Sequence, residues 1–253
     1  MRRMFILSPL VLALLSVSSA AAFFDEIVAL KAELQVWEEA HAADFSDVVA
    51  RLDDLTAPAF ADVASNDWFN AYVSSLAEWG IVSGYKDASG NSTGEFRHAN
   101  PVTIAEVLKM AMEAAKVEQG NCTSDPAHAE ARGHWSQVYV VCGERMNMRL
   151  MSANAALELN RPAKRAEVVA IVHDAFGDEV LPVYSSFRDV AGHPFEADIA
   201  TASLYGMVSG DKDGEGRQIG TFRPDASINR AEVTKIIYER IKREARETLA
   251  TSM

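Results

Sequence analysis

The stretch FRPDASINRAEVTKII, Phe222 to Ile237, decides the fold because its central pattern occurs three times in the chain. The sequence VTIAEVLKM contains Glu106 at the matching place, and AKRAEVVAI contains Glu167. In each copy the glutamate is followed by apolar residues at helical spacing, which predicts a helix with one buried face. Three helices of this kind can bury one another in a central bundle.

A longer repeat surrounds the first and the last copy. Residues 60–87, FADVASNDWFNAYVSSLAEWGIVSGYKD, parallel residues 187–213, FRDVAGHPFEADIATASLYGMVSGDKD. Each begins with F-x-D-V and continues into an amphipathic helix of about four turns. Each helix ends at a glycine, Gly80 or Gly206, which permits a left-handed cap. Each copy therefore predicts helix, loop and second helix.

The middle copy is degenerate. Trp135, in GHWSQVYVVCGERMNM, stands where Trp68 and Phe195 stand in the other two copies, but the G-x-x-S-G turn is missing. The ammonium group of Lys164 cannot accept a hydrogen bond from a helix N–H, so we expect the second helix of this copy to begin earlier, near Asn160.

The second helices carry start signals at their glutamates. Thr103-x-x-Glu106 predicts a capping box, in which hydroxyl and carboxylate each satisfy a free backbone N–H. Asn229-x-x-Glu232 is a weaker version of the same pattern. The residues expected to act as caps rather than as ligands are Thr103, Glu106, Glu167 and Glu232.

These ordered motifs resemble the S-layer homology family, whose repeats run F-x-D-V, an aromatic residue, a glycine turn, F-x-P and T-R-A-E. The resemblance covers residues 60–243 and is strongest in the third copy. It implies an all-α fold, in which three helix-loop-helix repeats form a pseudo-threefold spindle around a central three-helix bundle, preceded by an N-terminal helical segment. The expected divisions are a signal peptide (1–22), a helical spacer (23–57), three repeats (58–117, 118–180, 181–246) and a tail (247–253).

The resemblance also implies a function, which is non-catalytic anchoring of exported proteins to the cell envelope. The usual partner is an anionic cell-wall polysaccharide, typically pyruvylated, held in grooves between repeats. A guanidinium at a helix N-terminus suits a carboxylate, because it offers two parallel hydrogen bonds beside a positive helix end. The candidate ligand-binding residues are Arg165, Arg230, Trp68, Trp135, Gly84, Gly210, Lys164 and Asn229.

One departure from the family pattern bears on this function. Ile104 stands where the T-R-A-E arginine is expected. We therefore expect the groove of the first repeat to lose its main anion contact, which leaves at most two working grooves. A different reading follows from the same departure: the chain is a structural or protein–protein component of the envelope that keeps the fold without binding sugar. Without the repeats, both arginines would be read as surface ion-pair partners, and both tryptophans read equally well as core anchors.

The N-terminus is typical of a secretory signal. A basic start precedes an apolar run, and small residues then predict cleavage near Ala22. An uncleaved membrane anchor is the alternative. Apolar residues at helical spacing over residues 25–55 favour a packed helical hairpin or spacer, with self-association as the second interpretation. No membrane span is expected after cleavage.

Composition and short motifs also limit the classes of partner and activity that we expect. The formal net charge of −12 argues against nucleic acid and anionic membranes, both of which require clustered cations. In an exported chain, the pair Cys122 and Cys142 predicts a disulfide rather than a metal site. The segment Asp211–Gly216 resembles the start of a calcium loop but lacks its final glutamate, so we interpret it as a turn. Catalytic motifs are missing, and we expect neither an enzyme nor a cofactor.

Overall fold

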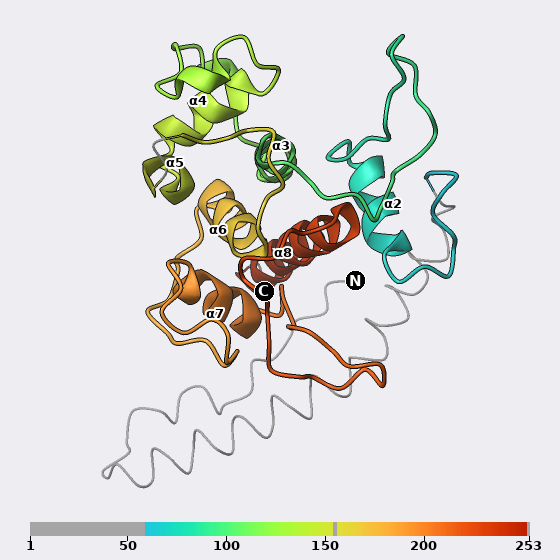
Figure 1. The fold of residues 1–253 in the computed structure, drawn as a ribbon, viewed down its shortest axis with the longest axis vertical. Helices are drawn as coiled ribbons and strands as arrows, with labels where there is room; N and C mark the ends of the chain where they lie inside the picture. Colours follow the sequence, from blue (N-terminus) through green and yellow to red (C-terminus); the bar gives the residue numbers. More distant parts are fainter. Residues whose placement is uncertain (1–58, 154–155, 252–253) are drawn as a thin grey trace, which may run out of the picture. The chain divides into compact units, whose positions relative to one another are not determined.

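Three helices begin at the three motif copies and pack against one another (Figure 1). They are α3 (Ile104–Ala114), α6 (Arg165–Phe176) and α8 (Arg230–Thr251), and each contacts the other two. This computed structural model describes residues 59–153 and 156–251, which belong to the second of two compact units, residues 56–253. The described residues form helices and contain no strand, so the chain is all-α as predicted.

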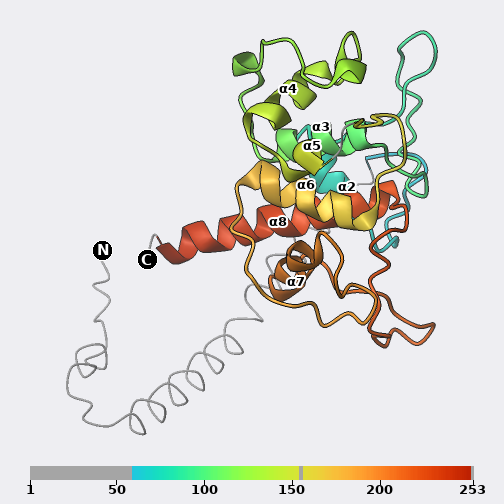
Figure 2. The same ribbon diagram turned by 60° about the vertical axis from the view of Figure 1, so that its left-hand side comes forward.

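Outer helices cover this central bundle (Figures 1 and 2). The outer helix α2 packs on α8, α4 packs on α3, and α7 packs on α6. The bounds are α2 (Asn70–Glu78), α4 (Gln137–Arg145) and α7 (Glu196–Leu204), with short pieces α5 (Arg149–Ala153), η2 (Gln119–Asn121) and η3 (Ala129–Ala131). Each of the three outer helices has 9 residues. The predicted length of about four turns for the outer helices of the first and third copies is therefore wrong, because residues expected to form their first turns lie in a loop.

A closed ring of backbone hydrogen bonds joins the segments that precede the three inner helices. The N–H of Val102 donates to the carbonyl of Ile228 (3.1 Å), that of Ile228 to Ala163 (3.2 Å), and that of Ala163 to Val102 (2.8 Å). All three residues are buried. The ring gives the bundle a pseudo-threefold axis and brings the starts of α3, α6 and α8 together.

The same segments satisfy the first N–H groups of the inner helices, which have no partner within their own helix. The N–H of Ile104 donates to the carbonyl of Arg161 (3.1 Å), that of Arg165 to Ala226 (2.9 Å), and that of Arg230 to Asn100 (3.0 Å). Each helix therefore begins against the neighbouring segment, in one cyclic order around the axis.

The glutamates complete these helix starts. Thr103 and Glu106 form a reciprocal capping box, and Asn229 and Glu232 form another. In the middle segment only the glutamate half exists: Glu167 accepts from the N–H of Lys164 at 2.8 Å, and α6 begins directly after this lysine. The expected earlier start near residue 160 is wrong, because bonds to the neighbouring segment replace the missing side-chain cap.

The outer helices end in left-handed residues, as the glycines predict. Gly80 and Gly206 both have φ 74°, and the middle segment uses Asn147 with φ 55°. Asparagine is the residue that most often replaces glycine in this conformation. The middle segment therefore makes the same helix end without the G-x-x-S-G motif.

The aspartate of F-x-D-V fixes the loop to the start of the next motif. Asp62 accepts hydrogen bonds from the N–H groups of Phe96 and Arg97, both at 2.7 Å, and Asp189 does the same for Phe222 and Arg223. Burial raises the pKa of Asp62, but backbone N–H donors, chiefly those of Phe96 and Arg97, together with the nearby His98, bring the pKa below its usual value.

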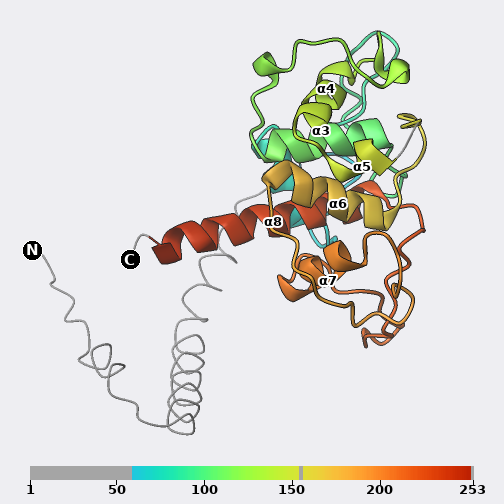
Figure 3. The same ribbon diagram turned by 90° about the vertical axis from the view of Figure 1, so that its left-hand side faces the viewer.

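The disulfide and the absence of a membrane span concern described residues, whereas the N-terminal predictions do not. Cys122 and Cys142 form the predicted disulfide. Among the described residues, no helix is both long and apolar enough to cross a membrane. The predicted signal peptide, spacer and self-association segment lie outside the described residues. Figure 3 shows α8 continuing beyond the other two inner helices toward the C-terminus.

Replacing Asp62 by Asn should lower the free energy of unfolding by about 1–3 kcal/mol at pH 7, because an amide cannot accept from both N–H groups as a carboxylate does. A carboxylate with a lowered folded-state pKa stabilises above the unfolded value of about 4 and loses this effect as the pH falls through the folded value. The difference between the variant and the wild type should therefore shrink in acid. Chemical denaturation across pH measures it, with the exposed Glu78→Gln as control; a pH-independent difference would contradict the prediction.

Reducing the disulfide should lower the free energy of unfolding by about 3 kcal/mol, since it closes a loop with a sequence separation of 20. Denaturation with and without reductant measures this. The Cys122→Ser/Cys142→Ser variant should have the same free energy of unfolding as the reduced protein, with or without reductant. A free energy of unfolding of the wild type that does not change on reduction would refute the estimate.

Candidate functional site

Two cavities of about 700 Å³ and 560 Å³ lie at matching places in the fold. Each is lined by the turn after an outer helix, by one face of an inner helix, by an arginine from the start of another inner helix, and by an exposed tryptophan from a third segment. We call them pocket 1 and pocket 2. Every lining residue of pocket 1 has a counterpart in pocket 2, which adds Tyr72 and Arg223, so the fold builds nearly the same pocket twice.

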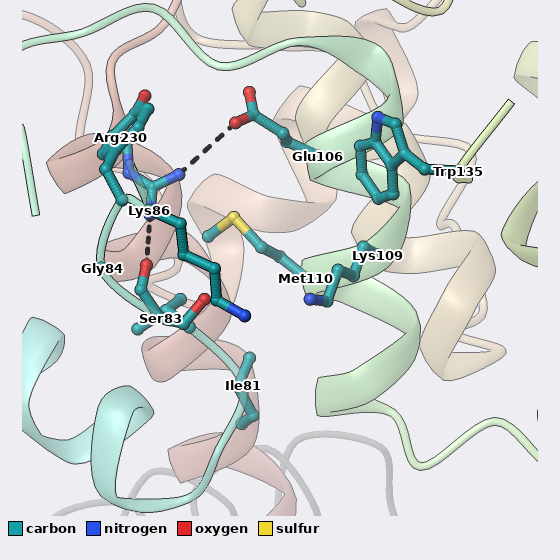
Figure 4. Close-up of a pocket in the computed structure, with 11 residues that line it drawn as sticks. Ile81, Ser83, Gly84, Lys86, Glu106, Lys109, Met110, Trp135 and Arg230 are labelled. Atoms are coloured by element: carbon teal, nitrogen blue, oxygen red, sulfur yellow. Dashed lines mark hydrogen bonds and ion pairs between the residues drawn. The ribbon is translucent and has the colours of Figure 1, made fainter. Parts of the chain in front are cut away.

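Pocket 1 joins all three segments (Figure 4). The turn after α2 supplies Ser83 and Lys86, and α3 supplies Glu106 and Lys109. Arg230, from the start of α8, donates to the carbonyl of Ser83 at 2.9 Å and lies 3.7 Å from Glu106. In α3, the position that matches Arg230 holds Ile104. The arginine of pocket 1 therefore comes from the third repeat rather than from the repeat that supplies the turn and α3.

That arrangement corrects one expectation. We expected Ile104 to deprive the groove of the first repeat of its arginine, but Arg230 occupies that groove. The first side chain of each inner helix lies toward the neighbouring segment, because the first N–H groups of the helix are bonded there. Ile104 therefore affects the interface with the middle segment instead.

Pocket 2 repeats this construction from the turn after α7 and from α8. Its lining includes Lys212, Glu232 and Lys235, with Arg165 from the start of α6 and Trp68 from the segment before α2. Asp211 also lines it, but two hydrogen bonds from the Arg223 guanidinium lower the pKa of Asp211 and keep it ionised. Asp211 and Glu232 balance only two of the four cationic side chains in the lining, so pocket 2 keeps a surplus of positive charge.

Both pockets are basic in an acidic chain. Three cationic side chains face one carboxylate in pocket 1, and four face two carboxylates in pocket 2. A local surplus of two positive charges against a net charge of −12 favours an anionic ligand.

The two arginines differ in how many donors they have left. Arg165 donates Nε to the carbonyl of Phe222 and NH1 to Glu232, both at 2.8 Å. Arg230 keeps a buried Nε that has no hydrogen-bond partner among the described residues. Each guanidinium also lies over a phenylalanine ring, at 4.9 Å from Phe222 for Arg165 and 4.6 Å from Phe96 for Arg230. A buried donor without an acceptor is costly, so the Nε of Arg230 lowers the stability that this side chain contributes.

The tryptophans and the glycines have separate roles. Trp68 and Trp135 are 57% and 55% exposed, so neither is a core anchor, and each offers a ring to its pocket. A Cβ on Gly84 would lie 2.9 Å from both the Glu95 carbonyl and the ring of Phe60. A Cβ on Gly210 would meet the corresponding partners in the third repeat. Both glycines are therefore required by packing inside the protein, although both line the pockets.

The other two candidate ligands lie away from the pocket linings. The Nζ of Lys164 pairs with Asp225 at 2.7 Å, and the side chain of Asn229 accepts from the N–H of Glu232 at 2.9 Å. Their predicted ligand role is not supported by any position in the pockets, whereas Glu106 and Glu232 line a pocket as well as capping a helix.

Sequence reasoning missed the four lysines of the pockets. They are Lys86, Lys109, Lys212 and Lys235. The signal was present, because Lys109 and Lys235 each follow the motif glutamate by three residues, which places them on the same helix face. Comparing the two strong repeats position by position would have found them.

The third interface, between α6 and α7, lacks these pocket residues. Ile104 takes the place of the arginine, and Ala170 that of the lysine. Pro194 takes the place of the tryptophan; the expected match with Phe195 is wrong, because Phe195 precedes α7 directly, as Phe69 precedes α2. The ion pair survives in changed form: Arg161, from the middle segment itself, donates two hydrogen bonds to Glu167 at 2.8 Å and 2.6 Å. Among the described residues, no cluster of His, Cys, Asp or Glu could hold a metal ion.

Replacing Arg165 by Met should cost more stability than replacing Arg230 by Met. Removing Arg165 breaks two bonds inside the protein and should cost about 1–3 kcal/mol, whereas Arg230 makes a single short bond worth about 1 kcal/mol. Thermal and chemical unfolding of both variants measures the order. Equal losses, or a larger loss for Arg230→Met, would contradict the difference in their contacts.

A comparison with protein families agrees with this geometry. Residues 59–107 and 186–234 match the S-layer homology domain, and these two segments contain the turns that line the pockets and the starts of the inner helices α3 and α8. No curated protein matches the chain. Domains of this family are generally non-enzymatic modules that anchor proteins at the cell wall and bind its glycans. The chain thus carries two segments that match the S-layer homology domain family, which points to an association with the cell surface or S-layer.

Proposed function

We propose that this protein is an exported envelope-anchoring module whose two basic pockets bind an anionic cell-wall polysaccharide, with pyruvate ketals as the source of the carboxylate. The middle segment acts as a third, modified S-layer homology repeat, which completes the bundle and contributes Trp135 and Arg165 to the two pockets. The observation that carries the proposal is pocket 1 itself, in which Arg230 and two lysines face one carboxylate and Arg230 makes a single side-chain hydrogen bond among the described residues.

The chemistry of pocket 1 suits a sugar that bears a carboxylate. The NH1 group of Arg230 makes only a long 3.7 Å contact with Glu106 among the described residues, so it can donate a charge-assisted hydrogen bond to a ligand carboxylate. Lys86 and Lys109 add point charges around the same space. Trp135 provides an apolar ring that can cover the face of a pyranose, while the hydroxyl groups of the sugar stay in water (Figure 4).

Pocket 2 provides a second candidate binding site, but its arginine is paired with a glutamate before any ligand binds. Its arginine is already bonded to Glu232, so a ligand carboxylate must compete with that carboxylate or bind through Lys212 and Lys235. We therefore expect pocket 1 to bind the free acid group more tightly than pocket 2 does. The internal pairing of Arg165 also supports a second candidate function, in which the arginines only connect neighbouring segments and the protein is a structural component of the envelope.

Binding to isolated wall polysaccharide distinguishes the two functions. Lys109→Ala/Lys235→Ala removes one cation from each pocket without breaking an ion pair among the described residues. Each charged contact is worth more than 1.4 kcal/mol, so we expect the affinity in a co-sedimentation assay to fall about tenfold or more. Arg165→Ala/Arg230→Ala should abolish binding, as should removal of pyruvate from the polysaccharide.

The matched control is Arg132→Ala/Arg188→Ala, which removes two exposed cations outside the pockets. Binding that falls equally in the control and in the lysine variant would indicate nonspecific charge attraction. Binding that survives both pocket variants would refute the pocket assignment, and no binding to any wall fraction would favour the structural function.

A further inference from the structure

The inference rests on the proposed function and concerns a row of aromatic rings that begins in pocket 2 and continues beyond it, with exposed tryptophans at its ends and partly buried tyrosines between them. Trp68 and Tyr72 line the pocket, and their rings lie 6.3 Å apart. Tyr238 of α8 follows at 5.2 Å from Tyr72, and Trp79 at the end of α2 follows at 5.9 Å from Tyr238. Helices α2 and α8 lie side by side along this row (Figures 1 and 2).

The far end of the row is built as a surface rather than as core. Trp79 is 51% exposed, and its ring is parallel to that of Tyr238, with an interplanar angle of 2°. Two rings stacked in this way hold each other in one orientation, and the outer ring still presents area to solvent. A single exposed aromatic side chain is ordinary, but a contiguous apolar surface that continues a pocket is a feature of binding sites.

Pocket 1 provides an internal comparison. It begins in the same manner, with Trp135 and Tyr139 at 6.5 Å, but the two positions that continue the row are Met112 and Met146. Met112 is fully buried, so the row ends there. The extension thus belongs to pocket 2 alone, although both pockets come from the same repeat.

The flanking charges and the continuity with the pocket indicate the occupant. Lys235 lines pocket 2, and Lys242, seven residues later on the same face of α8, lies with its Nζ 5.9 Å from the ring of Tyr238 and 3.7 Å from the carboxylate of Glu239, which offsets part of its charge. A row of rings with cations beside it suits a chain of sugar units that carries acidic groups, because apolar sugar faces stack while carboxylates stay near ammonium groups.

We infer that pocket 2 and the row Trp68, Tyr72, Tyr238 and Trp79 form one extended binding track for several consecutive units of an anionic glycan. Pocket 1, by contrast, holds the acidic unit alone. Trp79 is then the distal subsite, and its contribution depends on the length of the glycan. The track compensates for the paired state of Arg165, since binding energy along the chain adds to that of the acidic unit.

Binding of size-fractionated wall polysaccharide tests the track. Affinity is measured by calorimetry for single repeating units and for longer fragments, using the full chain and the variants Trp79→Ala, Trp79→Phe and Met146→Ala. We expect Trp79→Ala to weaken long-fragment binding about tenfold and to leave single-unit binding unchanged, as the loss of one stacked ring predicts. Trp79→Phe should retain most of the affinity, and Met146→Ala, the matching position beside pocket 1, should show no dependence on length.

The outcomes separate this inference from the proposed function. If Lys109→Ala/Lys235→Ala weakens binding but Trp79→Ala leaves every fragment unaffected, the pockets bind glycan and the track is wrong. If Trp79→Ala dissociates a dimer in sedimentation and leaves glycan affinities unchanged, the row binds a second copy of the chain instead. Absence of binding by the wild type to any fragment would overturn both the proposed function and the track.

Discussion

The described fold depends on three buried backbone hydrogen bonds that close a ring between Val102, Ala163 and Ile228. Each bond joins two segments far apart in the sequence, and each buried backbone group would be costly without its partner. Because the ring places every inner helix against its neighbour, the first N–H groups of α3, α6 and α8 bond to another segment rather than to water. Helix capping and the packing of the repeats are therefore the same set of interactions.

This cyclic arrangement also makes the pockets composite. A side chain at the first position of an inner helix lies toward the neighbouring segment, so Arg230 reaches the turn after α2 and Arg165 reaches the turn after α7. The pockets exist only when all three segments are in place, although only two of those segments match the S-layer homology domain. The middle segment consequently matters for binding even though its own interface with α7 lacks the pocket residues.

The middle segment keeps its structural bonds while its sequence changes. Asn147 replaces the glycine at the end of the outer helix, and Glu130 accepts from the N–H of Leu157 as Asp62 and Asp189 do for the matching phenylalanines. Ile104 and Leu157 are both fully buried at the positions where the other interfaces pair an arginine with a phenylalanine ring. An apolar pair thus stands in for a cation–π pair, and the bundle is retained without a basic groove.

The sequence by itself determined the helical class, the three motif copies, the capping glutamates, the left-handed glycines and the disulfide, because each depends on residues close in sequence or on a single pair of cysteines. Repeat comparison also identified Arg165, Arg230, Trp68 and Trp135, and it could have identified the pocket lysines. Only the tertiary structure decided which arginine enters which pocket, which donors remain free, and that α2 aligns its aromatic residues with Tyr238. Those features arise from hydrogen bonds and packing between distant segments, which local sequence patterns do not specify.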